Sequence, residues 1–228
     1  MSETALLYAC GILLTRVVYL PNDERLSWWA SALQAAAQIV LVLILFEFSR
    51  PIMALIALLS VVASLAFLLE TSERVRSGMR LLTLGAQLSP VLILWQFGFF
   101  EPRYPGVGEP TLLLPFLGLL LLANEANYLV RLLFNWCGLT PKLPVIAGEP
   151  QKVDEEEYKA GRVIGMLERV LIFLIVYFTS DLSAVGFILA AKGVIRIRQL
   201  RDRQFSEYML IGTLASVTCA VAVAFALQ

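Results

Sequence analysis

About eight apolar segments dominate the sequence, and each comes close to the roughly 20 residues that a helix needs to cross the hydrocarbon core of a membrane. A soluble domain of 228 residues could not hide this much apolar surface in one core, since 59% of the residues are hydrophobic and 16% are charged. The apolar runs are continuous rather than alternating, which excludes a strand barrel. The sequence therefore predicts an all-α fold, a polytopic transmembrane helical bundle with spans at residues 5–20, 28–48, 51–69, 81–99, 111–134, 162–178, 183–197 and 208–227.

The whole chain, residues 1–228, is expected to form a single membrane domain without a large soluble domain. The longest connection, residues 135–161, should hold a cytoplasmic loop and then a helical extension of the sixth span, because Asp154 is a plausible N-cap and three Glu follow it. The sixth and seventh spans are short, so a re-entrant pair is an alternative to two full crossings. Pro90 and Pro115 predict kinks inside the fourth and fifth spans.

Basic residues predict the orientation of the bundle. Most Lys and Arg between spans lie in the connections that follow odd-numbered spans, and only Arg50 and Arg103 lie in the others. By the positive-inside rule the odd connections are cytoplasmic, so both termini are expected outside. The start, "MSETALL", has no basic residue before the apolar run, which favours a first span over a signal peptide.

Several kinds of chemistry have no motif in this sequence. The chain has no His, and its three cysteines, Cys10, Cys137 and Cys219, are scattered singly, so neither a metal site nor a Ser-His arrangement is predicted. We expect no cofactor and no enzymatic activity. No motif indicates nucleic acid as a partner; the expected partners are the lipid bilayer, further copies of this chain and an anionic cytoplasmic ligand.

One predicted span carries an unusual polar face. In "LLLLANEANYLVRLLFN" the side chains of Asn124, Asn127, Tyr128 and Arg131 lie within an arc of about 100° on an ideal helix, and Glu125 flanks that arc by about 60°. Lipid is an unfavourable neighbour for these groups. The face should therefore point into the bundle or toward water.

Charged residues in other spans are biased toward the cytoplasmic half. Glu168, Arg169 and Lys192 follow this bias, as do Glu125 and Arg131. The pattern predicts a polar cavity open to the cytoplasm, in which Glu125 or Glu168 pairs with Lys192, Arg131 or Arg169.

Structural roles remain open for the same groups. Arg16, Arg131 and Lys192 can snorkel to the interface, and the glutamates can form ion pairs that only fasten helices together. The amides of the predicted spans, Gln34, Gln38 and Gln87, either line a path or hold helices together.

Four arginines lie between the last two spans, in "RIRQLRDRQFSEY": Arg196, Arg198, Arg201 and Arg203. They either orient the bundle or bind an anionic ligand, such as a nucleotide or a lipid headgroup.

The C-terminal third of the chain resembles a bacterial integral-membrane family known only as a domain of unknown function. The resemblance rests on "GRVIGMLER", "VGFILAAK" and "EYMLIGTLAS", with the matching residues Gly161, Glu168, Arg169, Gly186, Lys192, Arg196, Glu207, Tyr208, Gly212 and Thr213. The N-terminal half departs from the family pattern. The resemblance implies a bacterial inner membrane and supplies no activity.

These observations favour a channel or a small-solute or ion transporter with a cytoplasm-facing charged cavity. A subunit of 25.3 kDa could also assemble into an oligomeric pore gated by an anionic ligand. The alternatives are a non-catalytic membrane scaffold or subunit and, with less support, a membrane-embedded lipid-modifying enzyme.

Overall fold

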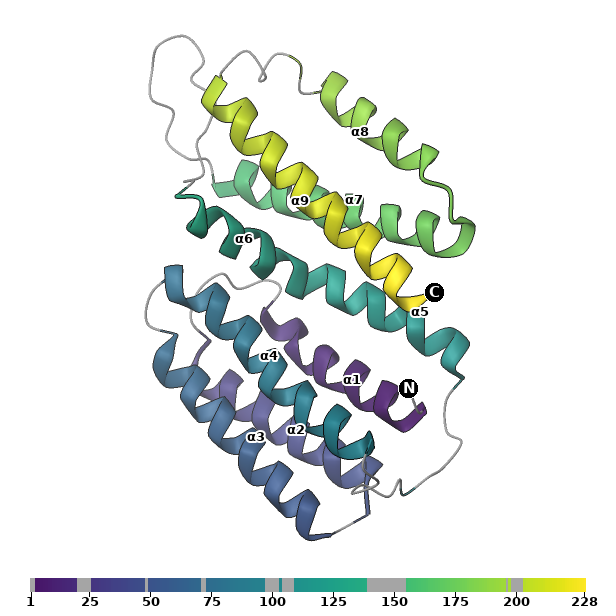
Figure 1. The fold of residues 1–228 in the computed structure, drawn as a ribbon. Coiled ribbons are helices and arrows are strands. Elements are labelled where there is room, and N and C mark those ends of the chain that lie inside the picture. Colours follow the sequence, from purple (N-terminus) through teal and green to yellow (C-terminus); the bar gives the residue numbers. More distant parts are fainter. Residues whose placement is uncertain are drawn as a thin grey trace. The chain divides into compact units, whose positions relative to one another are not determined.

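The computed structural model describes residues 3–19, 26–47, 49–70, 73–96, 103, 109–138, 155–195, 197 and 203–228, and the regular elements within them are all helical (Figure 1). An all-α fold is thus confirmed for the described residues. The chain divides into two compact units, Met1–Leu129 and Val130–Gln228, and each is described by itself.

Unit 1 is a bundle of helices joined in antiparallel fashion. In chain order they are α1 (Glu3–Thr15), the 3-10 turn η1 (Arg16–Tyr19), α2 (Trp28–Leu45), α3 (Arg50–Leu69), α4 (Glu73–Gln96), α5 (Pro110–Leu120), the π-helical turn η2 (Leu121–Glu125) and the start of α6 (Ala126–Trp136). Helix α1 packs against α2, α4 and α5, while α3 packs against α2 and α4 (Figure 1).

Local sequence signals begin and bend these helices. The Ser27 side chain accepts a hydrogen bond from the Ala30 N–H and caps α2. Pro51 and Pro110 lie in the first turns of α3 and α5, where a missing N–H costs nothing. Pro90 and Pro115 lie inside α4 and α5, as the sequence predicted.

Helix α1 forms the centre of unit 1. It is apolar on nearly every side, and a helix of this kind is stable only when other helices surround it. Tyr8 and Ile12 are accordingly inaccessible to solvent. The Tyr8 hydroxyl donates a 2.8 Å hydrogen bond to the Gln87 carbonyl of α4, so even the polar tip of this core residue has a partner.

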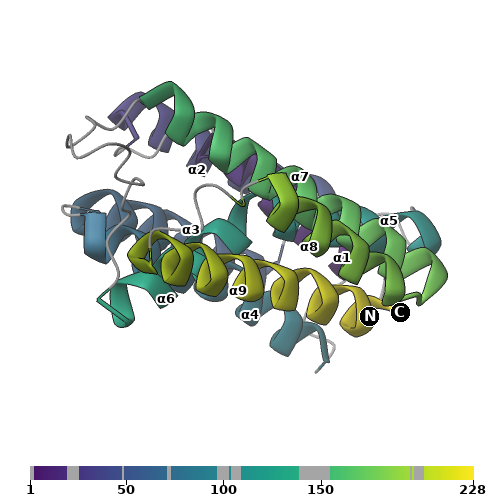
Figure 2. The ribbon, with the colours of Figure 1, turned by 90° about the horizontal axis from the view of Figure 1, so that it is seen from above.

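Unit 2 contains the rest of α6, α7 (Glu155–Thr179), α8 (Ser183–Ile195) and α9 (Arg203–Leu227). Helix α9 packs along α7, and α8 contacts α7 (Figures 1 and 2). Between α7 and α8 the Asp181 carboxylate accepts a 2.8 Å hydrogen bond from the Ser183 N–H. That bond lowers the pKa of Asp181 below its ordinary value, because it favours the ionised form.

The loop predicted after the fifth span lies mostly outside the described residues, as does Asp154. The helical extension predicted before the sixth span is confirmed, since α7 runs without a break from Glu155 to Thr179.

Every predicted span contains a helix, but not every helix is long and apolar enough to cross a membrane. Helices α1 and α8 have 13 residues each, or about 20 Å, which is short of the roughly 30 Å hydrocarbon core. Helices α4 and α7 are longer, but their charged and amide side chains make them less apolar. Among the described residues, four stretches are long and apolar enough: Trp28–Leu45, Arg50–Leu69, Pro110–Trp136 and Ser206–Leu227.

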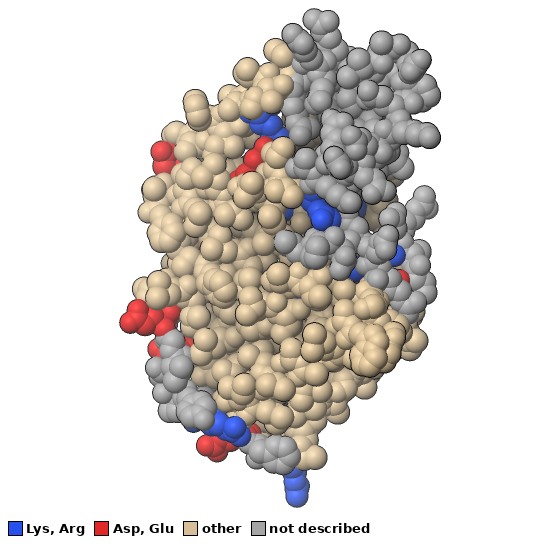
Figure 3. All heavy atoms as spheres, turned by 180° about the vertical axis from the view of Figure 1, so that it is seen from behind, with Lys and Arg blue, Asp and Glu red and all other residues tan. Residues whose placement is uncertain are grey.

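These helices support a membrane-embedded protein; they do not support the predicted count of about eight spans or the placement of both termini outside. The surface agrees with a lipid environment. On the face that Figure 3 shows, most described side chains are neither acidic nor basic. Large apolar side chains such as Leu33 and Leu82 are exposed, as expected for residues in contact with acyl chains.

Candidate functional site

The polar face predicted in the fifth span lies partly on a π-helical turn. The turn, Leu121–Glu125, has more residues per turn than an α-helix, so each residue advances by a smaller angle. Asn124 and Glu125 are both buried, at 3% and 4% exposure, although α-helical periodicity set Glu125 apart from the polar arc. The Asn124 amide donates to the Glu125 Oε1 at 3.0 Å and to the Arg16 carbonyl at 3.2 Å.

Glu125 forms a buried ion pair with Arg16 of η1. Arg16 Nε lies 2.7 Å from Glu125 Oε1, and Arg16 Nη2 lies 3.1 Å from Glu125 Oε2, so the pair is bidentate. The side chains are 1% and 5% exposed. A charge at this depth is tolerated only when paired, so the two residues hold η1 and η2 together.

The remaining donors of Arg16 all point into unit 1. Nη2 also donates to the Arg80 carbonyl at 2.6 Å, and Nη1 donates to Thr83 Oγ1 at 3.2 Å and Gln87 Oε1 at 3.4 Å. A guanidinium has five N–H donors, and these contacts use them all. Arg16 is therefore a structural junction of η1, α4 and η2 rather than a snorkelling residue.

A second ion pair joins the end of α3 to α4. Arg80 Nε and Nη2 each lie 3.3 Å from a carboxylate oxygen of Glu70, and both side chains are buried. Arg80 Nη1 donates to the Tyr128 hydroxyl at 2.9 Å. The Tyr19 ring lies 4.3 Å from the Arg80 guanidinium and 5.4 Å from that of Arg16, so it bridges the two pairs by cation–π contact.

Amide side chains extend this network away from the charges. Gln87 Nε2 donates to Gln38 Oε1 at 3.1 Å, and Gln38 Nε2 donates to Thr15 Oγ1 at 3.1 Å. The Thr15 hydroxyl in turn donates to the Ile12 carbonyl at 2.7 Å. This row of hydrogen bonds runs from Gln87 of α4 through Gln38 of α2 to Thr15 of α1. It fixes which group donates and which accepts in each bond.

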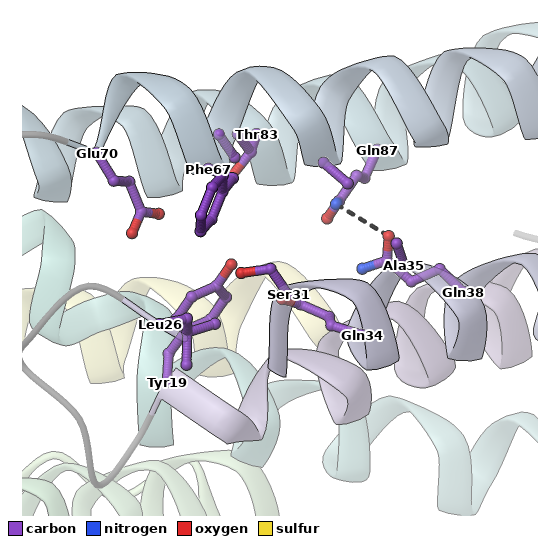
Figure 4. Close-up of a pocket in the computed structure, with 12 residues that line it drawn as sticks. Tyr19, Leu26, Ser31, Gln34, Ala35, Gln38, Phe67, Glu70, Thr83 and Gln87 are labelled. Carbon is purple, nitrogen blue, oxygen red and sulfur yellow. Dashed lines mark hydrogen bonds between the residues drawn. The ribbon is translucent and has the colours of Figure 1, made fainter. Parts of the chain in front are cut away.

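A small cavity adjoins these groups in unit 1. In Figure 4, Glu70 directly after α3, Phe67 of α3, and Thr83 and Gln87 of α4 face Tyr19 of η1 and the α2 side chains Ser31, Gln34 and Gln38. The centre of a water-sized sphere can occupy about 20 Å³ of it, which is room for one or two water molecules. The cavity therefore combines a lining that is about half polar with a size that admits only small molecules.

Unit 2 holds a separate charged group. Lys192 of α8 forms an ion pair with Glu168 of α7, and these side chains are 17% and 21% exposed. Arg169 is buried and donates from Nη1 to Ser216 Oγ of α9 at 3.1 Å. The contacts fasten α7 to both of its neighbours.

The sequence-predicted site residues thus fall into different groups. The pairing of Glu168 with Lys192 is one of the predicted alternatives, whereas Glu125 pairs with Arg16, which the sequence did not suggest. Asn127 donates to the Ala123 carbonyl of its own helix at 3.2 Å. Arg131 is half-buried in the part of α6 that belongs to unit 2.

The predicted arginine cluster falls between the end of α8 and the start of α9. Arg196, Arg198 and Arg201 lie outside the described residues, and Arg203 is described only as the first residue of α9. An anionic ligand site at this cluster stays a prediction.

Sequence reasoning missed Glu70 and Arg80 and assigned no site role to Tyr19. Arg80 was interpreted as an orienting charge, because a basic residue near a helix end usually is one. A signal was present, since Glu70 and Arg80 are opposite charges at the two ends of one short connection. No three acidic or cysteine side chains gather as in a metal site within the part of the chain that the structure describes.

Comparisons of the chain with protein-family models, with curated proteins and with solved structures found no match.

Proposed function

We propose that the chain is a polytopic membrane protein of about eight spans that acts as a channel or transporter for a small solute or ion. The path runs through the polar cavity of unit 1, and the two buried ion pairs keep its cytoplasmic end closed. The observation that carries this proposal is a cavity lined by amides, hydroxyls and Glu70 inside a bundle whose outer surface is apolar. Polar and ionisable groups are energetically costly inside a membrane bundle, and where they occur they often mark a solute or ion pathway.

The position of the network supports a cytoplasmic opening. Arg16 follows the last residue of α1, Glu70 follows α3, and Arg80 lies in the first third of α4. Because neighbouring helices run antiparallel, these three positions lie at the same end of unit 1. The connections at that end carry the basic residues that predict the cytoplasmic side.

The ion pairs are placed to act as a gate. Arg16–Glu125 joins η1 to η2, and Arg80–Glu70 joins α4 to the end of α3, so each pair ties two elements around the cavity together. Removing either pair frees the helix ends that close the polar lining. In this proposal the path opens when η1 separates from η2 or α4 separates from the end of α3.

Glu168, Arg169, Lys192 and Arg131 of unit 2 are proposed as further path or gate residues on the predicted cytoplasmic side. The predicted cluster of four arginines, Arg196, Arg198, Arg201 and Arg203, is proposed to bind an anionic ligand that controls opening. Several copies of the chain are proposed to assemble in a bacterial inner membrane.

One observation favours a second candidate, a membrane scaffold without transport. All five donors of Arg16 have acceptors within unit 1, as expected of a residue that only stabilises the fold. A lipid-modifying enzyme, the third possibility, gains no comparable support from the described contacts.

Solute flux across liposomes containing the purified protein tests the proposal. The wild-type chain is compared with Glu125→Gln, which removes the charge of the gate while keeping its shape. Glu125→Gln should raise the flux, because Arg16 loses its counter-charge and η1 separates more readily from η2. Glu168→Gln makes the same chemical change at a more exposed pair in unit 2, so comparing the two variants shows which pair holds the path closed.

An unchanged fold is checked for each variant by gel filtration and circular dichroism. If neither the wild type nor Glu125→Gln moves any ion or neutral solute, transport is the wrong function and the scaffold takes its place. If only Glu168→Gln raises the flux, the path lies in unit 2.

A further inference from the structure

We propose that the solute admitted by the unit 1 cavity is uncharged: a small hydrogen-bonding molecule of the size of water or ammonia. The inference rests on the proposed function, because it names the class of solute that the same path accepts. Three properties of the lining carry it: its charge balance, its hydrogen-bonding groups and its size.

The cavity offers no unbalanced charge to an ion. Glu70 is the one acidic or basic side chain among the described residues that line it, and Arg80 binds both oxygens of that carboxylate. The nearby Arg16 guanidinium is paired with Glu125 and has all of its donors in use. An ion that left water for this site would lose its hydration without gaining a free counter-charge.

The lining does offer donors and acceptors to a neutral molecule. Gln38 and Gln87 are oriented by the hydrogen bonds that join them to each other and to Thr15. Each amide has two N–H donors and two acceptor lone pairs on its oxygen, so this chain leaves further capacity on both residues. Ser31 and Gln34 of α2 add a hydroxyl and an amide to the lining (Figure 4). A molecule with both donors and acceptors matches the polar part of this lining, and the remaining part is formed by small and apolar side chains such as Ala63 and Leu26.

The size of the cavity selects within the neutral class. About 20 Å³ is open to the centre of a water-sized sphere, which suits one or two molecules as small as water or ammonia. A hydrated ion is larger than the space and would have to shed its water to enter. Charge balance and size thus exclude the same solutes.

The test measures neutral and charged permeants in the same liposomes. Osmotic shrinkage in a stopped-flow instrument reports water, internal alkalinisation reports ammonia, and voltage-dependent dyes report potassium and chloride. The wild type and Glu125→Gln should raise the permeability of the liposomes to water or ammonia and leave both ion fluxes at the level of protein-free liposomes.

Gln38→Leu removes one hydrogen-bonding group from the lining at similar volume. It should lower the neutral flux by about tenfold, which corresponds to the loss of one hydrogen bond to the solute. Ser64→Ala is the control, because the Ser64 hydroxyl bonds to the Ser60 carbonyl of its own helix and lies on the exposed side of α3. If Gln38→Leu does not fold, Gln34→Leu makes the same change at another cavity residue.

The outcomes separate the two proposals. Potassium or chloride flux through the wild type or Glu125→Gln overturns the neutral-solute inference and leaves the transport function standing. Neutral flux that a folded Gln38→Leu or Gln34→Leu variant leaves unchanged also overturns it. No flux of any permeant in either protein overturns both.

Discussion

The Arg16–Glu125 pair makes a quantitative prediction about stability. Replacing Glu125 with Leu leaves the Arg16 guanidinium buried without a counter-charge, and Arg16→Leu leaves the Glu125 carboxylate in the same position. The two side chains are 1% and 5% exposed, so water cannot take over the lost contacts. Each single change should therefore lower the free energy of unfolding by about 3–5 kcal/mol.

The double variant should be less damaging than the sum of the single changes. With both charges gone, no charge is left buried, and the Arg80 carbonyl and the Asn124 amide keep other partners, the Thr83 hydroxyl at 2.9 Å and the backbone carbonyl of residue 16 at 3.2 Å. The Gln87 side-chain oxygen loses its 3.4 Å donor, and a buried polar group left without a partner costs about 1–3 kcal/mol. The double-mutant cycle should then give a coupling energy of at least about 2 kcal/mol between the two sites.

Reversible unfolding in mixed micelles, followed by circular dichroism, measures all four corners of the cycle. The Glu168–Lys192 pair is the matched control, because it joins the same kinds of charge at 21% and 17% exposure. Its cycle should give a coupling energy of no more than about 1 kcal/mol. Additive effects of Arg16→Leu and Glu125→Leu would refute the claim that this pair is a coupled, desolvated junction.

Two further predictions concern unit 2. Gly212→Ala should destabilise the protein by about 1–3 kcal/mol in the same unfolding assay, because a Cβ at this position would lie 2.7 Å from Phe134 Cζ. Gly186→Ala is the control: its Cβ would meet nothing within 4 Å, so this change should be neutral or stabilising. The hydrogen bond from the Ser183 N–H lowers the pKa of Asp181, so the bond stabilises the start of α8 above the unfolded pKa and this stabilisation is lost as the pH falls through the folded pKa. Hydrogen exchange of the Ser183 amide should therefore accelerate at acidic pH relative to the other α8 amides. An unchanged ratio of these exchange rates would contradict this prediction.

Helix positions could be predicted from the sequence, because long apolar runs between polar connections determine them locally. Each predicted span contains a helix, and the start of α3 at Arg50 and the end of α9 at Leu227 fall within one residue of the prediction. The number of crossings could not be predicted equally well. Length and hydropathy are marginal for α1 and α8, because a helix of 13 residues is compatible with several arrangements.

The candidate site could be predicted only in part. The burial of Asn124 and Tyr128 follows from helical periodicity, which places them on one face. The partner of Glu125 does not follow, because Arg16 lies 109 residues away and packing of whole helices brings the two together. The π-helical turn also changes the direction of Glu125, and no α-helical periodicity predicts such a turn.

Single-sided cysteine labelling tests the central claim most directly, namely that the unit 1 cavity lies toward the cytoplasmic side of the membrane. Ser31→Cys is made in a variant whose three natural cysteines are replaced, and Leu33→Cys is the control at nearly the same depth. Ser31 lines the cavity, whereas Leu33 is 73% exposed on the outer face of α2. A small charged thiol reagent is too large to enter the cavity, but it should modify Cys at position 31, a partly exposed position, from the predicted cytoplasmic side of oriented membrane vesicles and should spare position 33. Equal labelling of the two positions, or labelling of position 31 only from the opposite side, would contradict the account.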